Sequence, residues 1–114
     1  MGFSEGKRMT CPICTGSKLP EDVSIVDKYG RRVLLQGKIY AIINPKDAHY
    51  PPFADYFTVS LYPRKGKVKY LKFSTKEELD KWELIPDTRI KCEGCLHKAN
   101  GKEIMFDITN IEFL

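Results

Sequence analysis

The chain has 114 residues and a formal net charge of +4, a length that predicts one domain with a modest core. Its longest uninterrupted apolar run covers only residues 39–43, whereas a membrane-spanning helix needs about 20 residues. Composition therefore excludes a membrane helix, and no apolar signal segment follows the N-terminus. We expect a flexible tail over 1–10 and a single domain over 11–114.

Charge is distributed unevenly along the chain. Residues 1–76 hold 14 Lys or Arg and 6 Asp or Glu, whereas residues 77–114 hold 5 and 9. A basic part beside an acidic part predicts a polyanionic partner on one face, and the acidic C-terminal part is a candidate site for a protein partner. The alternative is a solvated surface with uneven charge.

Alternating apolar residues predict five strands, over residues 32–44, 56–62, 68–73, 89–97 and 103–113. In the first strand the alternation places five side chains on the core face: Val33, Leu35, Ile39, Ala41 and Ile43. Gly37 interrupts this strand, and a glycine at such a position indicates a tight bend or bulge. The segment 45–55 is a predicted loop because it contains adjacent prolines.

A helix is predicted between the third and fourth strands. Thr75 and Glu78 have the spacing of a capping box, in which each side chain satisfies a free backbone amide. Apolar residues then follow at helical spacing up to a proline, which predicts a helix over 76–85. We expect Trp82 on this helix to close one end of the core.

The order of three strands, a helix and two strands resembles the OB-fold, a small five-stranded barrel, over about residues 31–114. The segments VLLQGKI (33–39) and IKCEGCL (90–96) share a pattern in which a glycine interrupts alternating apolar residues. OB-fold proteins of the replication protein A and tRNA-anticodon-binding kinds often carry such glycines in their first and fourth strands. The resemblance implies a mainly β, five-stranded OB-like barrel. The alternatives are another small barrel, or a zinc ribbon with a large insertion.

The cysteines form two Cys-x-x-Cys pairs, Cys11 with Cys14 and Cys92 with Cys95. In a chain without an export signal such pairs favour a reducing, cytoplasmic location and metal binding over disulfides. Four thiolates are the ligands of a closed, structural Zn²⁺ site. The sequence therefore predicts an N-terminal zinc knuckle over 11–22 that shares its zinc with the second pair.

The fold must bring the two pairs together, because 77 residues separate them. The OB-like topology does so, since it makes the first and fourth strands antiparallel neighbours. Cys92 and Cys95 point to opposite faces of a regular strand, however, and share one metal only if the chain bends at Gly94. Otherwise Cys92 is a small core residue and Cys95 is a surface thiol. His97 is close to Cys95 in the sequence and is a separate candidate for a substitute ligand. Unligated cysteines and redox chemistry are the remaining alternatives.

A basic and aromatic surface is predicted around the hairpin between the second and third strands. Residues 64–76 contain six Lys or Arg and no acid. The resemblance implies that a single strand of DNA or RNA lies over this part of the sheet. The expected stacking residues are Tyr40, Tyr56, Tyr62 and Tyr70, and the expected phosphate contacts are Lys38, Arg64, Lys65, Lys67, Lys69 and Lys72.

The sequence thus predicts a single-strand-binding protein with weak sequence preference. The alternative is a docking module within a larger complex, since some proteins that join a zinc ribbon to an OB-fold are accessory subunits of acyl-CoA enzymes. Their cysteines lie together in one ribbon, which this chain does not show. We expect no catalysis, because the sequence has no P-loop, dinucleotide fingerprint or nucleophile motif.

Overall fold

A computed structural model of the protein describes residues 11, 13–15, 30–45, 56–99 and 101–114. The predicted tail (1–10), most of the predicted knuckle (12 and 16–22) and the loop 46–55 lie outside the described residues. Within the described part, no helix is long and apolar enough to cross a membrane.

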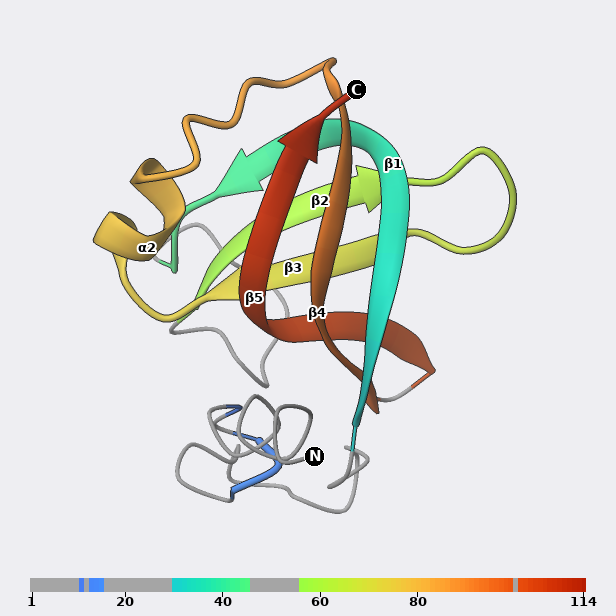
Figure 1. Ribbon diagram of the computed structural model, residues 1–114, viewed down its shortest axis with the longest axis vertical. Coiled ribbons are helices and arrows are strands. Elements are labelled where there is room, and N and C mark those ends of the chain that lie inside the picture. The colour runs from blue at the N-terminus through green and yellow to red at the C-terminus, as the bar shows by residue number, and fades with distance from the viewer. Residues whose placement is uncertain (1–10, 12, 16–29, 46–55, 100) are drawn as a thin grey trace.

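Five strands form a closed barrel in the order β1-β2-β3-β5-β4 (Figure 1). Their bounds are β1 Arg31–Ile43, β2 Phe57–Tyr62, β3 Lys69–Phe73, β4 Arg89–Ala99 and β5 Lys102–Phe113. One short helix, α2 (Lys76–Asp80), lies between β3 and β4 among the described residues. This confirms the predicted five-stranded barrel and the antiparallel pairing of the first strand with the fourth.

The bend in β1 lets this strand pair with two neighbours. Its first part pairs with β4 as far as Lys38, and its second part pairs with β2 from Lys38 onward. Gly37 lies at the crossing, where a Cβ atom would be 2.8 Å from the Leu61 side chain and from the Tyr62 carbonyl oxygen. A side chain is therefore excluded where the strand bends, as the sequence predicts.

A bulge at Tyr40 changes the alternation in the last part of β1. Ile39 pairs with Leu61 but Ala41 pairs with Ser60, so Tyr40 is the extra residue. After the bulge Ile42 packs against the core. The prediction that Ala41 and Ile43 face the core is therefore corrected.

Helix α2 begins with the predicted cap and ends early. The Glu78 amide donates to Thr75 Oγ1 at 3.1 Å, and the Glu78 carboxylate accepts from the Ser74 amide at 3.1 Å. The helix extends only to Asp80 rather than to residue 85, and Glu83 beyond it has a φ of 51°. Trp82 lies beyond the end of the helix, rather than on it as expected, and it packs against the barrel core.

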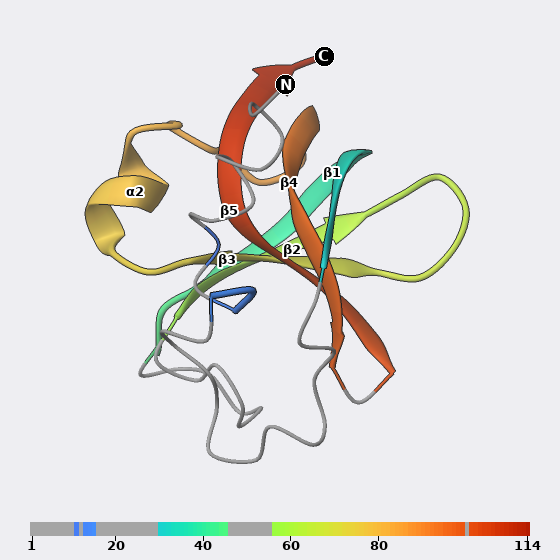
Figure 2. The same ribbon diagram turned by 60° about the horizontal axis from the view of Figure 1, so that its bottom comes forward.

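Two hydrophobic clusters lie on opposite faces of the same strands. The inward core includes Ile39, Val59, Leu61, Leu71, Ile90, Cys92 and Met105. The second cluster lies on the outer face of β3, β4 and β5, because it takes the alternate residues Tyr70, Cys95, Ile104 and Phe106. It also contains Cys11 and Ile13, whose blue segment lies outside the strands in Figures 1 and 2. We call residues 11 and 13–15 the N-terminal turn.

Candidate metal centre and binding face

Four potential metal ligands meet on the outer face of β4. The Sγ atoms of Cys11, Cys14 and Cys95 and a ring nitrogen of His97 all lie within 4.8 Å of one another. His97 Nε2 is 3.4 Å from Cys95 Sγ, 3.5 Å from Cys11 Sγ and 3.6 Å from Cys14 Sγ. Cys14 Sγ and Cys95 Sγ are 3.5 Å apart. The N-terminal turn and β4 thus contribute two ligands each, close enough to hold one metal ion.

Strand alternation explains why His97, and not Cys92, joins this cluster. Cys95 and His97 are two residues apart and share the outer face of β4. Cys92 points into the barrel core, where its Sγ lies 4.0 Å from Met105 Sδ. The predicted set of four cysteines is therefore corrected at one position, with His97 in place of Cys92.

The irregularity near Gly94 belongs to β5 and leaves β4 regular. Glu93 pairs with Asn110 whereas Cys95 pairs with Phe106, so the additional residues lie in β5. Asp107 in that segment has a φ of 49°. Since β4 has no bulge at Gly94, Cys92 and Cys95 stay on opposite faces.

The backbone around the cluster is arranged to receive the sulfurs. Both the amide and the hydroxyl of Thr15 donate to the Cys11 carbonyl, at 3.1 and 3.0 Å, which closes the N-terminal turn. The Gly30 amide donates to Cys14 Sγ at 3.5 Å. A Cβ atom at Gly30 would lie 2.5 Å from His97 Nε2, so this position leaves room for the imidazole only as glycine.

Burial removes most of the cluster from water. Cys11, Cys95 and His97 are buried, and Cys14 is half-buried. The His97 ring meets the Phe106 ring edge to face, with centroids 5.6 Å apart, which holds its orientation. The four donors are therefore both fixed in position and largely desolvated.

The thiols of the cluster differ in acidity. Hydrogen bonds from Cys95 and, less strongly, from His97 lower the pKa of Cys11 to about 4 despite burial. The pKa of Cys95 is raised, first by its hydrogen bond to Cys11 and then by burial. Burial raises the pKa of Cys92 to about 12. The negative charge is thus favoured at Cys11, where a cation would compensate it, while Cys92 stays a neutral thiol.

The structure buries two of the residues that we expected to bind nucleic acid. Tyr56 is only 3% exposed and meets Phe106 edge to face, with ring centroids 5.5 Å apart. Lys72 is 9% exposed, and its Nζ donates to Thr58 Oγ1 at 2.6 Å. The prediction that both lie on an open surface is wrong.

Two further expected contacts are engaged within the protein. Lys69 forms an ion pair with Glu103, the residue opposite it on β5. Tyr70 is half-buried and packs against the second cluster. The outer surface of β3 is therefore not the open binding surface that the sequence predicted.

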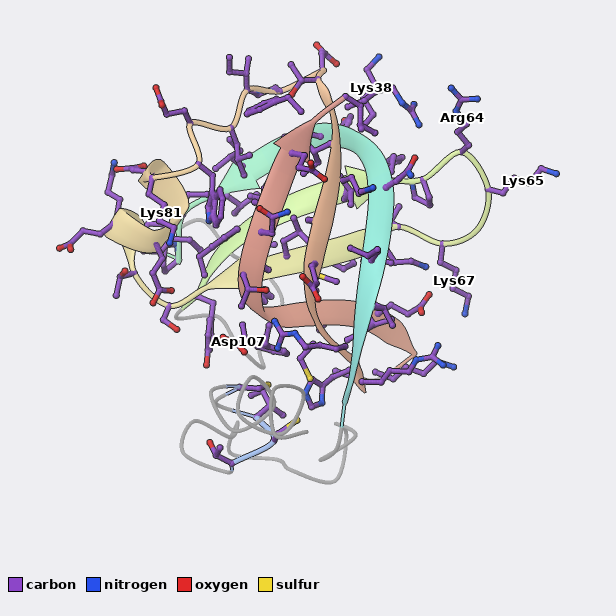
Figure 3. All side chains as sticks on the ribbon, viewed as in Figure 1. Lys38, Arg64, Lys65, Lys67, Lys81 and Asp107 are labelled. Carbon is purple, nitrogen blue, oxygen red and sulfur yellow. The ribbon has the colours of Figure 1, made fainter. Side chains whose placement is uncertain are left out.

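The other six predicted binding residues are exposed: Lys38, Tyr40, Tyr62, Arg64, Lys65 and Lys67. The Tyr40 and Tyr62 rings contact each other, with centroids 5.0 Å apart and an interplanar angle of 38°. Both residues nevertheless remain open to solvent, with exposed fractions of 66% for Tyr40 and 46% for Tyr62. Lys38 lies opposite Tyr62 in the strand register. Figure 3 shows Lys38 and the three hairpin cations on one side of the molecule, away from Lys81 on the turn after α2. We call these six residues the binding face.

Sequence reasoning missed a cavity of about 260 Å³ between α2 and β5. Trp82, Phe106 and Asp107 contribute to its lining. Lys81 Nζ lies 4.8 Å from the centre of the Trp82 ring, and Arg32 pairs with Asp107 at 2.9 Å. No local pattern predicts this cavity, because residues from distant segments form it.

Comparisons with known proteins add little to this picture. No protein-family model matches the chain, and the search of curated proteins gives no match. A solved structure of an OBody bound to hen egg-white lysozyme is similar in backbone, with a TM-score of 0.49 and 20% sequence identity. The similarity covers 75% of this chain and 81% of that chain.

Proposed function

We propose that this protein binds single-stranded nucleic acid on the binding face, and that a structural Zn²⁺ ion holds the N-terminal turn on the barrel. The observation that carries the first part is the exposed Tyr40–Tyr62 pair: Lys38 lies directly opposite Tyr62, and the cations of the β2–β3 hairpin follow Tyr62 along the chain. The second part rests on the geometry of Cys11, Cys14, Cys95 and His97.

The chemistry of the binding face matches that of a single strand. An exposed aromatic ring offers a base a stacking surface worth about 1–3 kcal/mol, whatever the base. Tyr40 and Tyr62 provide two such rings on adjacent strands. Lys38, Arg64 and Lys65 are exposed around them, and each cation that neutralises a phosphate releases counterions. Stacking that tolerates any base predicts weak sequence preference for DNA or RNA.

The donor geometry supports zinc. Zn–S bonds of about 2.3 Å and Zn–N bonds of about 2.0–2.1 Å at tetrahedral angles place the nitrogen about 3.6 Å from each sulfur. The three distances from His97 Nε2 are 3.4, 3.5 and 3.6 Å. Three thiolates and one imidazole fill all four positions of a tetrahedral site, which makes the proposed zinc structural.

The proposed zinc would hold the N-terminal turn against the second cluster, on the outer face of β3, β4 and β5. We call this arrangement the cover. Ile13 is fully buried in the second cluster, next to the ligands Cys11 and Cys14. A structural zinc contributes about 10 kcal/mol or more, whereas closing a long chain loop costs only a few kcal/mol. The cover would hide Tyr56 and leave the binding face as the open aromatic surface.

The test is a titration of fluorescent 12-nucleotide single strands of DNA and RNA, followed by anisotropy at two salt concentrations. We expect salt-sensitive binding that is tighter than binding to duplex. The double variant Tyr40→Ala/Tyr62→Ala should weaken it by about tenfold or more, because two stacking surfaces are lost. Leu34→Ala is the matched control, since Leu34 is 61% exposed on the same strand but outside the binding face.

Two outcomes would contradict the proposal. One is unchanged affinity in a folded Tyr40→Ala/Tyr62→Ala variant. The other is a zinc-loaded wild-type protein that binds no nucleic acid. In that case, capture of a protein partner that does not depend on salt would favour the docking module.

A further inference from the structure

We infer that a bound single strand continues from the binding face onto β4, where Arg89 and Lys91 contact its phosphates. This inference rests on the proposed function and assigns the course of the strand. The polynucleotide would cross β2, β1 and β4, rather than lie over β2 and β3.

The strand register places the residues in one row. Lys38 on β1 lies opposite Tyr62 on β2, and it also lies opposite Arg89 on β4. Side chains directly opposite each other project from the same side of a sheet, with Cβ atoms about 4.5–5.5 Å apart. Tyr62, Lys38 and Arg89 therefore form a continuous row across three strands.

The row is extended at both ends. On β4, Lys91 lies two residues from Arg89, on the same face, and opposite Gln36. Beyond Tyr62 the hairpin contributes Arg64, Lys65 and Lys67, all exposed. With neighbouring strands about 4.7–4.9 Å apart, the row spans about 10 Å from β2 to β4 before either extension is counted. Cations thus lie beside Tyr62 on β1 and β4, and beyond it in the hairpin.

The alternative course over β3 is obstructed. Tyr56 and Lys72 on that face are buried, and Tyr70 packs against the second cluster, which contains Ile13 of the N-terminal turn. A nucleic-acid strand that stacks on Tyr62 can continue over Tyr40 and Lys38 to β4, because Tyr40 and Lys38 are exposed.

Acidic residues mark the limits of the row. Glu93 lies opposite Leu34, two residues beyond Lys91 on β4. The Asp87 amide donates to the Ile39 carbonyl, which places this exposed acid beside the other end. Both would repel a polyanion that left the row.

Arg89 is expected to contribute more than Lys91. Lys91 Nζ lies 3.9 Å from a Glu112 carboxylate oxygen, so part of its charge is compensated. No ion pair within the described part of the chain engages Arg89.

The test is the salt dependence of single-strand binding in Arg89→Gln/Lys91→Gln. Each lost phosphate contact lowers the slope of log affinity against log salt by about 0.7 for single strands. The double variant should therefore lose about 1.4 from the slope, and its affinity should fall by about tenfold. Lys81→Gln/Lys98→Gln is the matched control, because it removes the same charge from exposed positions outside the row.

The outcomes separate the inference from the proposed function. A larger loss of slope and affinity in Arg89→Gln/Lys91→Gln than in the control supports the path across β4. Equal, small losses in the two variants, with Tyr40→Ala/Tyr62→Ala still weakened, overturn the path and leave the binding face in place. Absence of wild-type binding overturns both. Thermal unfolding of each variant confirms that it is folded.

Discussion

Alanine substitution at Cys95 should abolish metal binding, whereas alanine substitution at Cys92 should leave it intact. The two residues are buried on the same strand, three positions apart, but they face different clusters. Cys92→Ala should retain one metal ion per chain and lose only about 1 kcal/mol of unfolding free energy, because it removes a single buried sulfur atom next to Met105.

Cys95→Ala should lose the metal and destabilise the protein by at least about 3–5 kcal/mol, and by up to the roughly 10 kcal/mol that a structural zinc contributes. Removing one partner from a buried charged cluster leaves the others uncompensated, and that cost alone accounts for the lower figure. Here the groups left behind are the low-pKa thiol of Cys11, the thiol of Cys14 and the imidazole of His97. His97→Cys should keep the metal, because four thiolates also form a tetrahedral zinc site.

The assay combines metal content with stability. Zinc per chain is measured by mass spectrometry of the purified variants, and unfolding free energy by urea titration with and without added zinc. The reasoning would be refuted if Cys92→Ala lost its metal as Cys95→Ala does, or if Cys95→Ala kept one zinc per chain.

Three further changes test separate parts of the structure. Gly30→Ala should lower zinc affinity by at least tenfold in a zinc-chelator competition, because its Cβ would lie 2.5 Å from the His97 ring nitrogen. Lys69 lowers the pKa of Glu103, so this pair stabilises the fold above the ordinary pKa of 4.5 and ceases to do so as pH falls through the lower folded-state pKa. Urea titrations should show Glu103→Gln less stable than wild type at pH 7, with the difference narrowing in acid. Thr75→Ala should cost about 1 kcal/mol in the same assay, because it removes the cap of α2.

The sequence patterns predicted the barrel because strand alternation and helix capping depend on residues that are close together in the chain. Alternation placed Val59, Leu61 and Leu71 in the core, and the capping box placed the start of α2. The alternation failed for Ala41 and Ile43, since the bulge at Tyr40 depends on pairing with β2. The sequence of one β-strand contains no information about the strand with which it pairs.

The metal cluster shows how two patterns can conflict. The Cys-x-x-Cys spacing suggested Cys92 as a ligand, whereas alternation along β4 placed it in the core and put His97 beside Cys95. Alternation was the better guide because hydrogen bonds to β1 and β5 keep β4 extended. A Cys-x-x-Cys pair favours a shared metal mainly in a turn, as at Cys11 and Cys14.

The burial of the outer face of β3, β4 and β5 could not be predicted from neighbouring residues in the sequence. Alternation correctly directed Tyr56 and Lys72 away from the core. It did not predict that the N-terminal turn and β5 would build a second cluster over that face. This cluster joins Ile13 and Phe106, residues that are far apart in the sequence and come into one cluster only in the folded chain.

The measurement that tests the central claim most directly is photo-cross-linking of a 5-iodouracil single strand to the zinc-loaded protein, followed by mass spectrometry of the cross-linked peptides. Our account predicts adducts at Tyr40 and Tyr62, the exposed ring pair of the binding face. Adducts at Tyr56 or Tyr70 in place of these would contradict it, as would a complex that yields no adduct at either exposed tyrosine.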